Sequence, residues 1–195
     1  MSRTYVRFFG GLLTLQERWL NKMAQRGYRL VHTTKATYTF TPCQSGEYQY
    51  CVEFIGEKSH QGAEAYRAFL EEMGYKVFYK NINLNYSVGK VRWRPWAQSG
   101  GQLATHATTF DRELLIVGKK ADGKPFALHT TYADRMAYIR RVQRPWLCLL
   151  AFSALGFALT RDWIWGIFGA VCLPAVLAQT AEWLLLRRQA KTEEW

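Results

Sequence analysis

The sequence predicts an α+β fold in which helices cover a largely antiparallel sheet, followed at the C-terminus by a hairpin of two transmembrane helices. Two observations predict it. Residues 1–134 mix charged and aromatic side chains as a soluble domain does, whereas residues 145–186 hold only three charged side chains. An apolar stretch of that length is typical of membrane spans. We therefore expect an α+β domain at 1–134, a basic juxtamembrane helix at 135–144 and a tail at 187–195.

An internal repeat organises the predicted domain. The first unit, about residues 4–45, reads as a strand, a helix, a glycine and two further strands. The second unit, about residues 48–90, shows the same order, with Tyr38 and Tyr86 at matching positions after the glycines. The sequence thus predicts duplicated β-α-β-β units. A further hairpin is expected from strands at 113–119 and 125–130.

The helix ends of this repeat carry recognisable signals. Thr14 and Glu17 have the spacing of a capping box at the start of the first helix. Gly27 and Gly74 follow the two helices, where a glycine commonly adopts the left-handed conformation that ends a helix. We expect positive φ at both glycines.

The C-terminal segment contains two apolar runs, residues 145–160 and 163–186, separated by Arg161 and Asp162. The first run is short for a span of about 20 residues, but the second is long enough. The alternative is a pair of buried helices in a soluble core. Such helices would show a polar face, and residues 147–159 have none.

Charge predicts the orientation of this hairpin. Basic residues precede the first run and follow the second, while the connecting loop carries one Arg and one Asp. The positive-inside rule then places both termini in the cytoplasm, in a multi-pass protein of the inner (cytoplasmic) membrane. Small residues recur at four-residue spacing at Ala154, Ala158, Gly166 and Ala170, which would let the helices pack closely. Oligomers through the transmembrane helices are a further possibility.

The net charge of +11 suits binding to anionic lipid or to nucleic acid. It is also ordinary for a protein that is held near the negative inner leaflet. The most distinctive stretch is residues 90–96, in which basic residues alternate with tryptophan. If this stretch forms a strand, three interpretations are open: it belongs to the core with one solvated edge, it contacts the membrane surface, or it binds nucleic acid. Nucleic-acid binding is the least expected of the three. The candidate surface for anionic lipid or a partner comprises Lys90, Arg92, Trp93, Arg94, Trp96, Arg140, Arg141 and Arg144.

Residues for chemistry are scarce in this pattern. None of His32, His60, His106 and His129 has metal-ligand spacing with another His or with Cys. Neither a phosphate-binding glycine loop nor a nucleophile elbow is present. We expect no enzyme activity, no metal and no cofactor.

Six short motifs stand out, at residues 17–24 (ERWLNKMA), 27–30 (GYRL), 38–40 (YTF), 42–43 (PC), 46–50 (GEYQY) and 69–75 (FLEEMGY). They resemble an uncharacterised bacterial membrane family, the domain of unknown function numbered twenty-eight twelve. They cover about residues 4–96 and, more weakly, 113–144, whereas 97–112 looks like an insertion. The resemblance implies a membrane-anchored domain without an established activity, often encoded beside PadR-type transcriptional regulators.

These observations together predict a membrane-tethered cytoplasmic binding or regulatory module. Membrane lipid is the expected partner, together with a protein such as a PadR-type regulator. Two alternatives remain open: a sensor of lipid headgroups or amphiphiles at the inner leaflet, and an enzyme with an unrecognised site.

Overall fold

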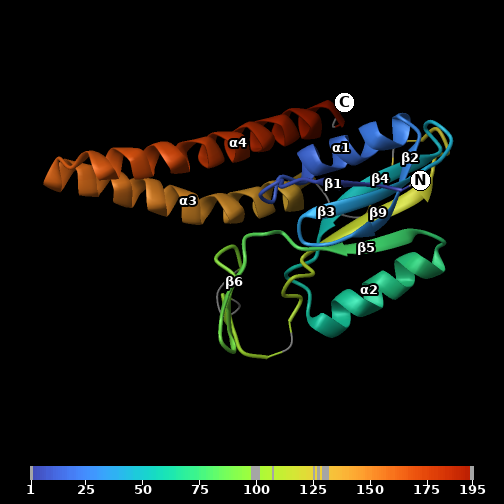
Figure 1. The fold of residues 1–195 in the computed structure, drawn as a ribbon, viewed down its shortest axis with the longest axis horizontal. Coiled ribbons are helices and arrows are strands. Elements are labelled where there is room, and N and C mark those ends of the chain that lie inside the picture. The colour runs from blue at the N-terminus through green and yellow to red at the C-terminus, as the bar shows by residue number, and fades with distance from the viewer. Residues whose placement is uncertain are drawn as a thin grey trace. The chain divides into compact units, whose positions relative to one another are not determined.

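A computed structural model shows an α+β protein that ends in two long apolar helices, as the sequence predicts (Figure 1). It describes residues 2–97, 102–106, 108–124, 126, 128 and 132–193, with side chains up to residue 190. The chain divides into two units, residues 1–130 and residues 131–195. The described strands belong to the first unit and the two long helices to the second.

The first sheet is formed by the N-terminal quarter of the chain. Its elements are β1 (Arg3–Val6), α1 (Leu13–Gln25), β2 (Tyr28–Thr33) and β3 (Thr37–Pro42). The strand order is β1-β3-β2, and β3 pairs antiparallel with both neighbours. β1 and β2 are therefore parallel to each other, joined by α1, with β3 inserted between them.

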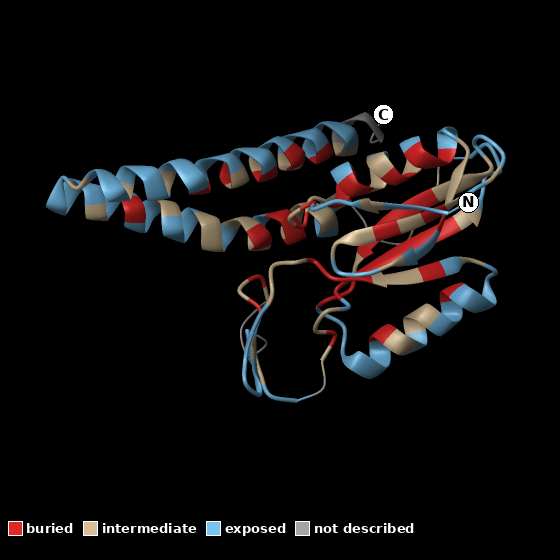
Figure 2. Cartoon of the chain, viewed as in Figure 1, coloured by how far each residue is buried: buried red, intermediate tan, exposed pale blue. Residues whose placement is uncertain are grey.

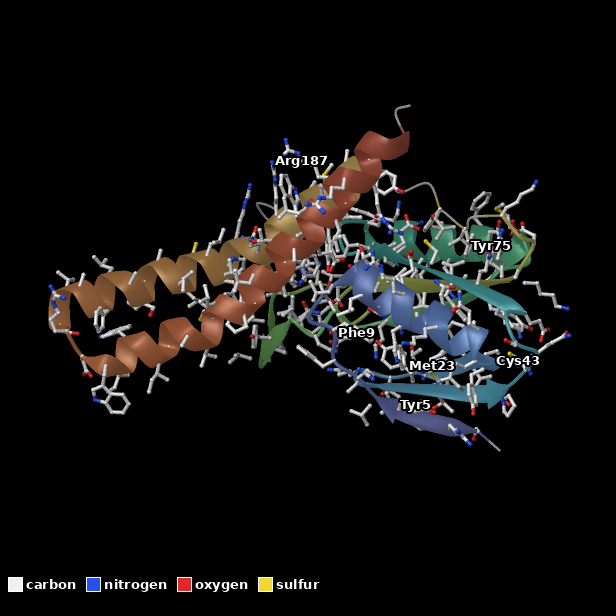
Figure 3. The ribbon with its side chains drawn as sticks, turned by 90° about the horizontal axis from the view of Figure 1, so that it is seen from above. Tyr5, Phe9, Met23, Cys43, Tyr75 and Arg187 are labelled. Atoms are coloured by element: carbon white, nitrogen blue, oxygen red, sulfur yellow. The ribbon has the colours of Figure 1, made fainter. Side chains whose placement is uncertain are left out.

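An aromatic cluster joins α1 to this sheet. Trp19 of α1 packs edge-to-face on Tyr38, at 4.9 Å between ring centroids, and on Phe40, at 5.5 Å. Tyr5 of β1 and Phe9, both labelled in Figure 3, surround the same indole. Edge-to-face geometry is favoured by the charge distribution of aromatic rings. The sheet buries Tyr38 and Phe40 almost completely under the helix.

The second sheet has the same strand–helix–strand order as the first, but its central strand comes from later in the chain. It contains β4 (Tyr48–Phe54), α2 (His60–Glu72), β5 (Lys76–Lys80) and β9 (Leu114–Lys120). β9 lies between β4 and β5 and pairs antiparallel with both. It is the most buried strand of the domain, as the red of Figure 2 shows.

A small third sheet lies in the segment between β5 and β9. It consists of β6 (Tyr86–Val88), β7 (Val91–Trp93) and β8 (Leu103–Ala104), in the order β6-β7-β8. A two-residue turn whose first member, Gly89, has φ +59° joins β6 to β7. This ribbon stands away from the two larger sheets (Figure 1).

The structure does not confirm the repeat within its predicted bounds. The strand at Tyr86 pairs with β7 and not with β5, so it does not complete the second unit. β9 takes that place. Both edges of β9 are paired, with β4 and β5, and the second strand of the predicted hairpin, residues 125–130, lies largely outside the described residues.

The predicted capping box of α1 is wrong. The N-cap residue is Leu12, which makes no side-chain cap, and Thr14 lies inside the first turn. The Glu17 carboxylate instead accepts a hydrogen bond of 3.0 Å from the backbone N–H of Val52 in β4. The carboxylate of Glu17 thus binds a partner that is distant in sequence.

Polar side chains of α1 seal the outer edge of β4. Asn21 donates to the carbonyl of Tyr50 at 2.8 Å and accepts from the N–H of the same residue at 2.9 Å. This amide satisfies one donor and one acceptor, as a neighbouring strand would. With Glu17 on Val52, the helix covers an edge that would otherwise be free to pair with another chain.

The second unit is a hairpin of α3 (Tyr132–Thr160) and α4 (Trp163–Glu193). The juxtamembrane helix predicted at 135–144 is part of α3, which begins at Tyr132 and continues without a break into the first apolar run. Gln143 donates to Thr180 Oγ1 at 2.7 Å, and the Ser153 hydroxyl donates to the carbonyl of Trp165. A side chain at Gly156 would collide with the ring of Trp165. Ala154, Ala158, Gly166 and Ala170, which were predicted to let the helices pack closely, are instead exposed.

Gly27 and Gly74 adopt φ +81° and +84°, which confirms the predicted helix ends. Replacing either with valine is expected to destabilise the fold by about 1 kcal/mol or more, because β-branched residues are strained at positive φ. We expect the larger loss at Gly27, since its new Cβ would lie 3.0 Å from the carbonyl oxygen of Cys43, whereas Gly74 has open space. Urea midpoints of the two variants test this; equal midpoints would contradict the steric part of the argument.

Candidate functional site

The basic stretch predicted at residues 90–96 does not form one exposed surface. Lys90 is exposed, and Arg92 is half-buried with its guanidinium 5.4 Å from the centre of the Phe110 ring. The strand ends at Trp93. Arg94 and Trp96 are 7% and 2% exposed, so their assignment to a docking surface is corrected. The two residues turn inward because they anchor the ribbon to the domain.

The remaining predicted surface residues lie in the second unit. Arg140 and Arg144 are exposed on α3, and Arg141 is half-buried. Arg140 and Arg187 both place a guanidinium near the Trp183 ring, at 5.1 and 5.3 Å from its centre. Cation–π pairs of this kind fix the direction of long basic side chains.

The ribbon carries an apolar surface that the sequence did not reveal. Residues directly opposite in antiparallel strands point to the same side, as do alternate residues of one strand. The pairs Tyr86↔Trp93 and Val88↔Val91, and the pair Trp93↔Leu103, therefore define one face. We call it the ribbon face: Tyr86, Val88, Val91, Trp93 and Leu103. All five are exposed, Val88 to 81% and Trp93 to 47%.

A buried polar cluster, here called the Glu113 cluster, fastens the segment between β5 and β9 to the sheet. Glu113 Oε2 accepts from the N–H of Ile82 at 3.1 Å, and Oε1 accepts from the N–H of Asp111 at 2.6 Å and from the Asn85 amide. Asn85 in turn accepts from the indole N–H of Trp96 at 2.7 Å. The cluster consists of Asn81, Asn85, Arg94, Trp96, Asp111 and Glu113.

Glu113 is fully buried, which has an electrostatic consequence. Burial raises the pKa of its carboxyl to about 7, although the hydrogen bonds from Ile82, Asp111 and Asn85 favour the charged form. Burial also lowers the pKa of Arg94, and the nearby Glu113 carboxylate opposes that shift. The fold thus keeps an acidic and a basic side chain within one poorly solvated region.

Lys80 is a second buried cation, at the end of β5. Its ammonium group donates to the carbonyls of Thr34 and Lys35, the latter at 2.9 Å, and lies 4.2 Å from the centre of the Tyr38 ring. Burial lowers the pKa of Lys80 to about 8. These bonds connect β5 to the β2–β3 turn and so hold the two sheets together.

The Glu113 cluster is suited to anchoring rather than to holding a ligand. Both carboxylate oxygens of Glu113 are occupied by N–H donors of the protein. Asp111 is engaged by the Asn81 amide and by Lys35, at 3.3 Å. Across the described parts of the chain, no three His, Cys, Asp or Glu residues are grouped so that they could hold a metal ion.

Two of the hollows at the surface of the described part of the first unit are similar in volume. One, of about 390 Å³, lies along α1 and the start of β4 and is lined mainly by polar groups, among them Glu17, Asn21, Gln25 and Gln49. The other, of about 360 Å³, lies between β2 and β5, beside Arg29, Val31 and Lys76. Each is large enough for a small polar molecule.

Sequence reasoning missed both the Glu113 cluster and the ribbon face. A weak signal for the cluster exists in the alternating amides Asn81, Asn83 and Asn85, and in a lone Glu113 before the apolar run of β9. Neither pattern specifies burial, because exposed loops are equally rich in asparagine.

The chain matches one protein family over residues 13–151, from the start of α1 into the middle of α3. The matched range begins after β1 and spans residues 97–112, where an insertion is predicted. No curated protein and no solved structure matches the chain. Since the match covers well over half of the sequence, the chain belongs to the family described as "Protein of unknown function (DUF2812)".

Proposed function

We propose that the chain is a membrane-tethered binding or regulatory module, with its α+β domain held at the cytoplasmic face of the inner membrane. The observation that carries the proposal is the outer surface of the helical hairpin. Large apolar side chains such as Phe152, Leu159 and Val171 are exposed on α3 and α4. Exposed apolar surface of this extent is stable in lipid and costly in water.

The lengths of the helices support the same proposal. The two candidate spans cover residues Tyr132–Thr160 and Trp163–Ala190, with 29 and 28 residues. At 1.5 Å per residue each extends about 42 Å, which exceeds the apolar thickness of about 30 Å. The excess at the start of α3 is basic, with Arg140, Arg141 and Arg144, and suits the cytoplasmic headgroup region.

The proposed role is binding rather than catalysis because the buried ionisable groups of the first unit serve its architecture. Glu113 and Lys80 are occupied by protein partners. The hollow along α1 offers amide groups and Glu17, which suit hydrogen bonding to a polar ligand. A protein partner such as a PadR-type regulator stays a prediction.

Cysteine labelling of intact cells tests the tether and its orientation. Cys43 and Cys148 are replaced by serine, and single cysteines are introduced by Ser2→Cys, Asp162→Cys or Lys191→Cys. An impermeant maleimide should label position 162 only, and permeabilised cells should show labelling at all three positions. The protein should also remain in the membrane pellet after an alkaline carbonate wash. Labelling of position 2 or 191 in intact cells would reverse the orientation, and release by carbonate would refute the tether.

A further inference from the structure

We propose that the ribbon face inserts into the headgroup region of the bilayer, so that the domain meets the membrane through β6, β7 and β8 in addition to its helical hairpin. This inference rests on the proposed function, because it requires the domain to be held at a membrane. It changes the chemistry expected of residues 90–96, since the apolar side of the ribbon, and not its basic side, becomes the contact surface.

The first argument is the exposure of the ribbon face. Five large apolar side chains lie on one side of a short antiparallel ribbon, and none of them is buried by the rest of the unit. The opposite side carries Ser87, Arg92 and Ala104, and Arg92 packs toward Phe110. The ribbon is therefore amphipathic, with Arg92 directed at Phe110 on one side and the large apolar side chains exposed on the other. A β-ribbon that is apolar on its free side needs a cover.

The second argument is the type of side chain. Trp93 and Tyr86 lie next to each other on the ribbon face, with ring centroids 5.4 Å apart. Both residues are enriched at membrane interfaces, where the ring enters the apolar edge and its polar atom stays with water and headgroups. Aliphatic Val88 and Val91 flank the turn at the tip of the ribbon.

The third argument is charge. Between Tyr86 and Ala104 the sequence has three basic residues and no acidic one. Arg94 is buried, but Lys90 is exposed in the turn at the tip of the ribbon. A cation beside an apolar tip complements the anionic phosphates of the inner leaflet, and each such cation strengthens attraction to an anionic surface. A protein partner would not require this absence of acidic groups.

The fourth argument is the anchoring of the ribbon. Trp96 packs against Phe54 at 5.1 Å between ring centroids and donates to Asn85, so the base of the ribbon is fixed to the domain. A fixed base keeps the ribbon face presented in one direction and lowers the conformational entropy lost when it docks.

A depth measurement on the full chain tests the inference. The protein is reconstituted in nanodiscs of phosphatidylcholine and phosphatidylglycerol, with Cys43 and Cys148 replaced by serine. An environment-sensitive fluorophore is attached after Val88→Cys, on the ribbon face, or after Ser87→Cys, one residue away on the opposite side. We expect the probe at position 88 to emit at shorter wavelength and to be quenched by a lipid that carries a nitroxide near its headgroup. The probe at 87 should be quenched by aqueous iodide instead.

A second measurement excludes insertion driven by the fluorophore itself. The probe is placed at Lys90→Cys, and Val88→Glu with Trp93→Glu is compared with the matched control Ser87→Glu. Two carboxylates on the ribbon face should abolish quenching by the lipid nitroxide, whereas the control should retain it.

Two outcomes would overturn the inference. If the probe at 88 is as accessible to iodide as the probe at 87, the ribbon face is solvated. If the probe at 88 is protected from iodide but not quenched by lipid, a protein covers the face. Failure of the tether is recognised separately, because the chain would then leave the membrane pellet in the carbonate wash.

Discussion

Replacing Glu113 with alanine is expected to lower the free energy of unfolding of the first unit by about 3–5 kcal/mol. The substitution leaves the N–H groups of Ile82 and Asp111 and the amide of Asn85 without their shared acceptor. It also leaves the buried Arg94 without the neighbouring carboxylate. Pulse proteolysis of the full chain in detergent micelles over a urea series measures the loss.

Glu64 provides the matched control for this prediction. Its carboxylate forms an exposed ion pair with Arg112 at 3.1 Å, so Glu64→Ala should change stability by no more than about 0.5 kcal/mol. A loss at Glu113 as small as that at Glu64 would show that the Glu113 cluster does not anchor the segment.

The pH dependence separates the charge of Glu113 from its packing. Its pKa is raised from 4.5 in the unfolded chain to about 7 in the fold, so the folded state binds the proton more tightly. The resulting stabilisation is fully present below about pH 4.5 and is lost as the pH rises through about 7. Relative to Glu113→Gln, which cannot titrate, the native chain should therefore lose stability between pH 5 and pH 8.

Replacing Gly118 with valine is expected to cost about 3 kcal/mol, because this glycine leaves room for the ring of Tyr50. A Cβ at position 118 would lie 2.8 Å from Cε1 of Tyr50. The ring has no freedom to move, since its hydroxyl accepts from the N–H of Leu30 at 2.7 Å and Asn21 holds its backbone. The same urea series measures the effect.

A double-mutant cycle makes this prediction specific. Tyr50→Ala removes the ring, so Gly118→Val should cost much less in that background than in the native chain, with a coupling of about 1–3 kcal/mol. Additive losses would mean that valine disturbs β9 for a reason other than contact with Tyr50.

The parts of the fold that could be predicted from sequence are those with local causes. The two long helices follow from apolar runs, and the ends of α1 and α2 follow from Gly27 and Gly74, which need positive φ. The α+β class follows from the alternation of strand and helix patterns. Each of these signals is contained within a few turns of chain.

The parts that could not be predicted depend on partners distant in sequence. The strand at β9 was recognisable, but its position between β4 and β5 was not, because pairing partners are not encoded in the strand's own pattern. Glu17 has the spacing of a capping residue, yet its carboxylate accepts a hydrogen bond from the N–H of Val52, thirty-five residues away. The same limit applies to Arg94 and Trp96. In the sequence they alternate basic and aromatic residues just as Lys90 and Trp93 do, and Lys90 and Trp93 are exposed. Arg94 and Trp96 are buried, and Trp96 makes tertiary contacts that the pattern does not encode.

The position of β9 has a consequence for how the chain is made. β4 and β5 leave the ribosome early, but the strand that must lie between them follows only after the whole segment that carries the ribbon. Until then each exposes an edge that can pair wrongly, and α1 protects only the outer edge of β4. Synthesis of α3 begins soon after β9, so the second sheet closes while α3 is being made. We therefore expect nascent chains to depend most on chaperones just before β9 is synthesised, and a translational pause at that point should increase this dependence.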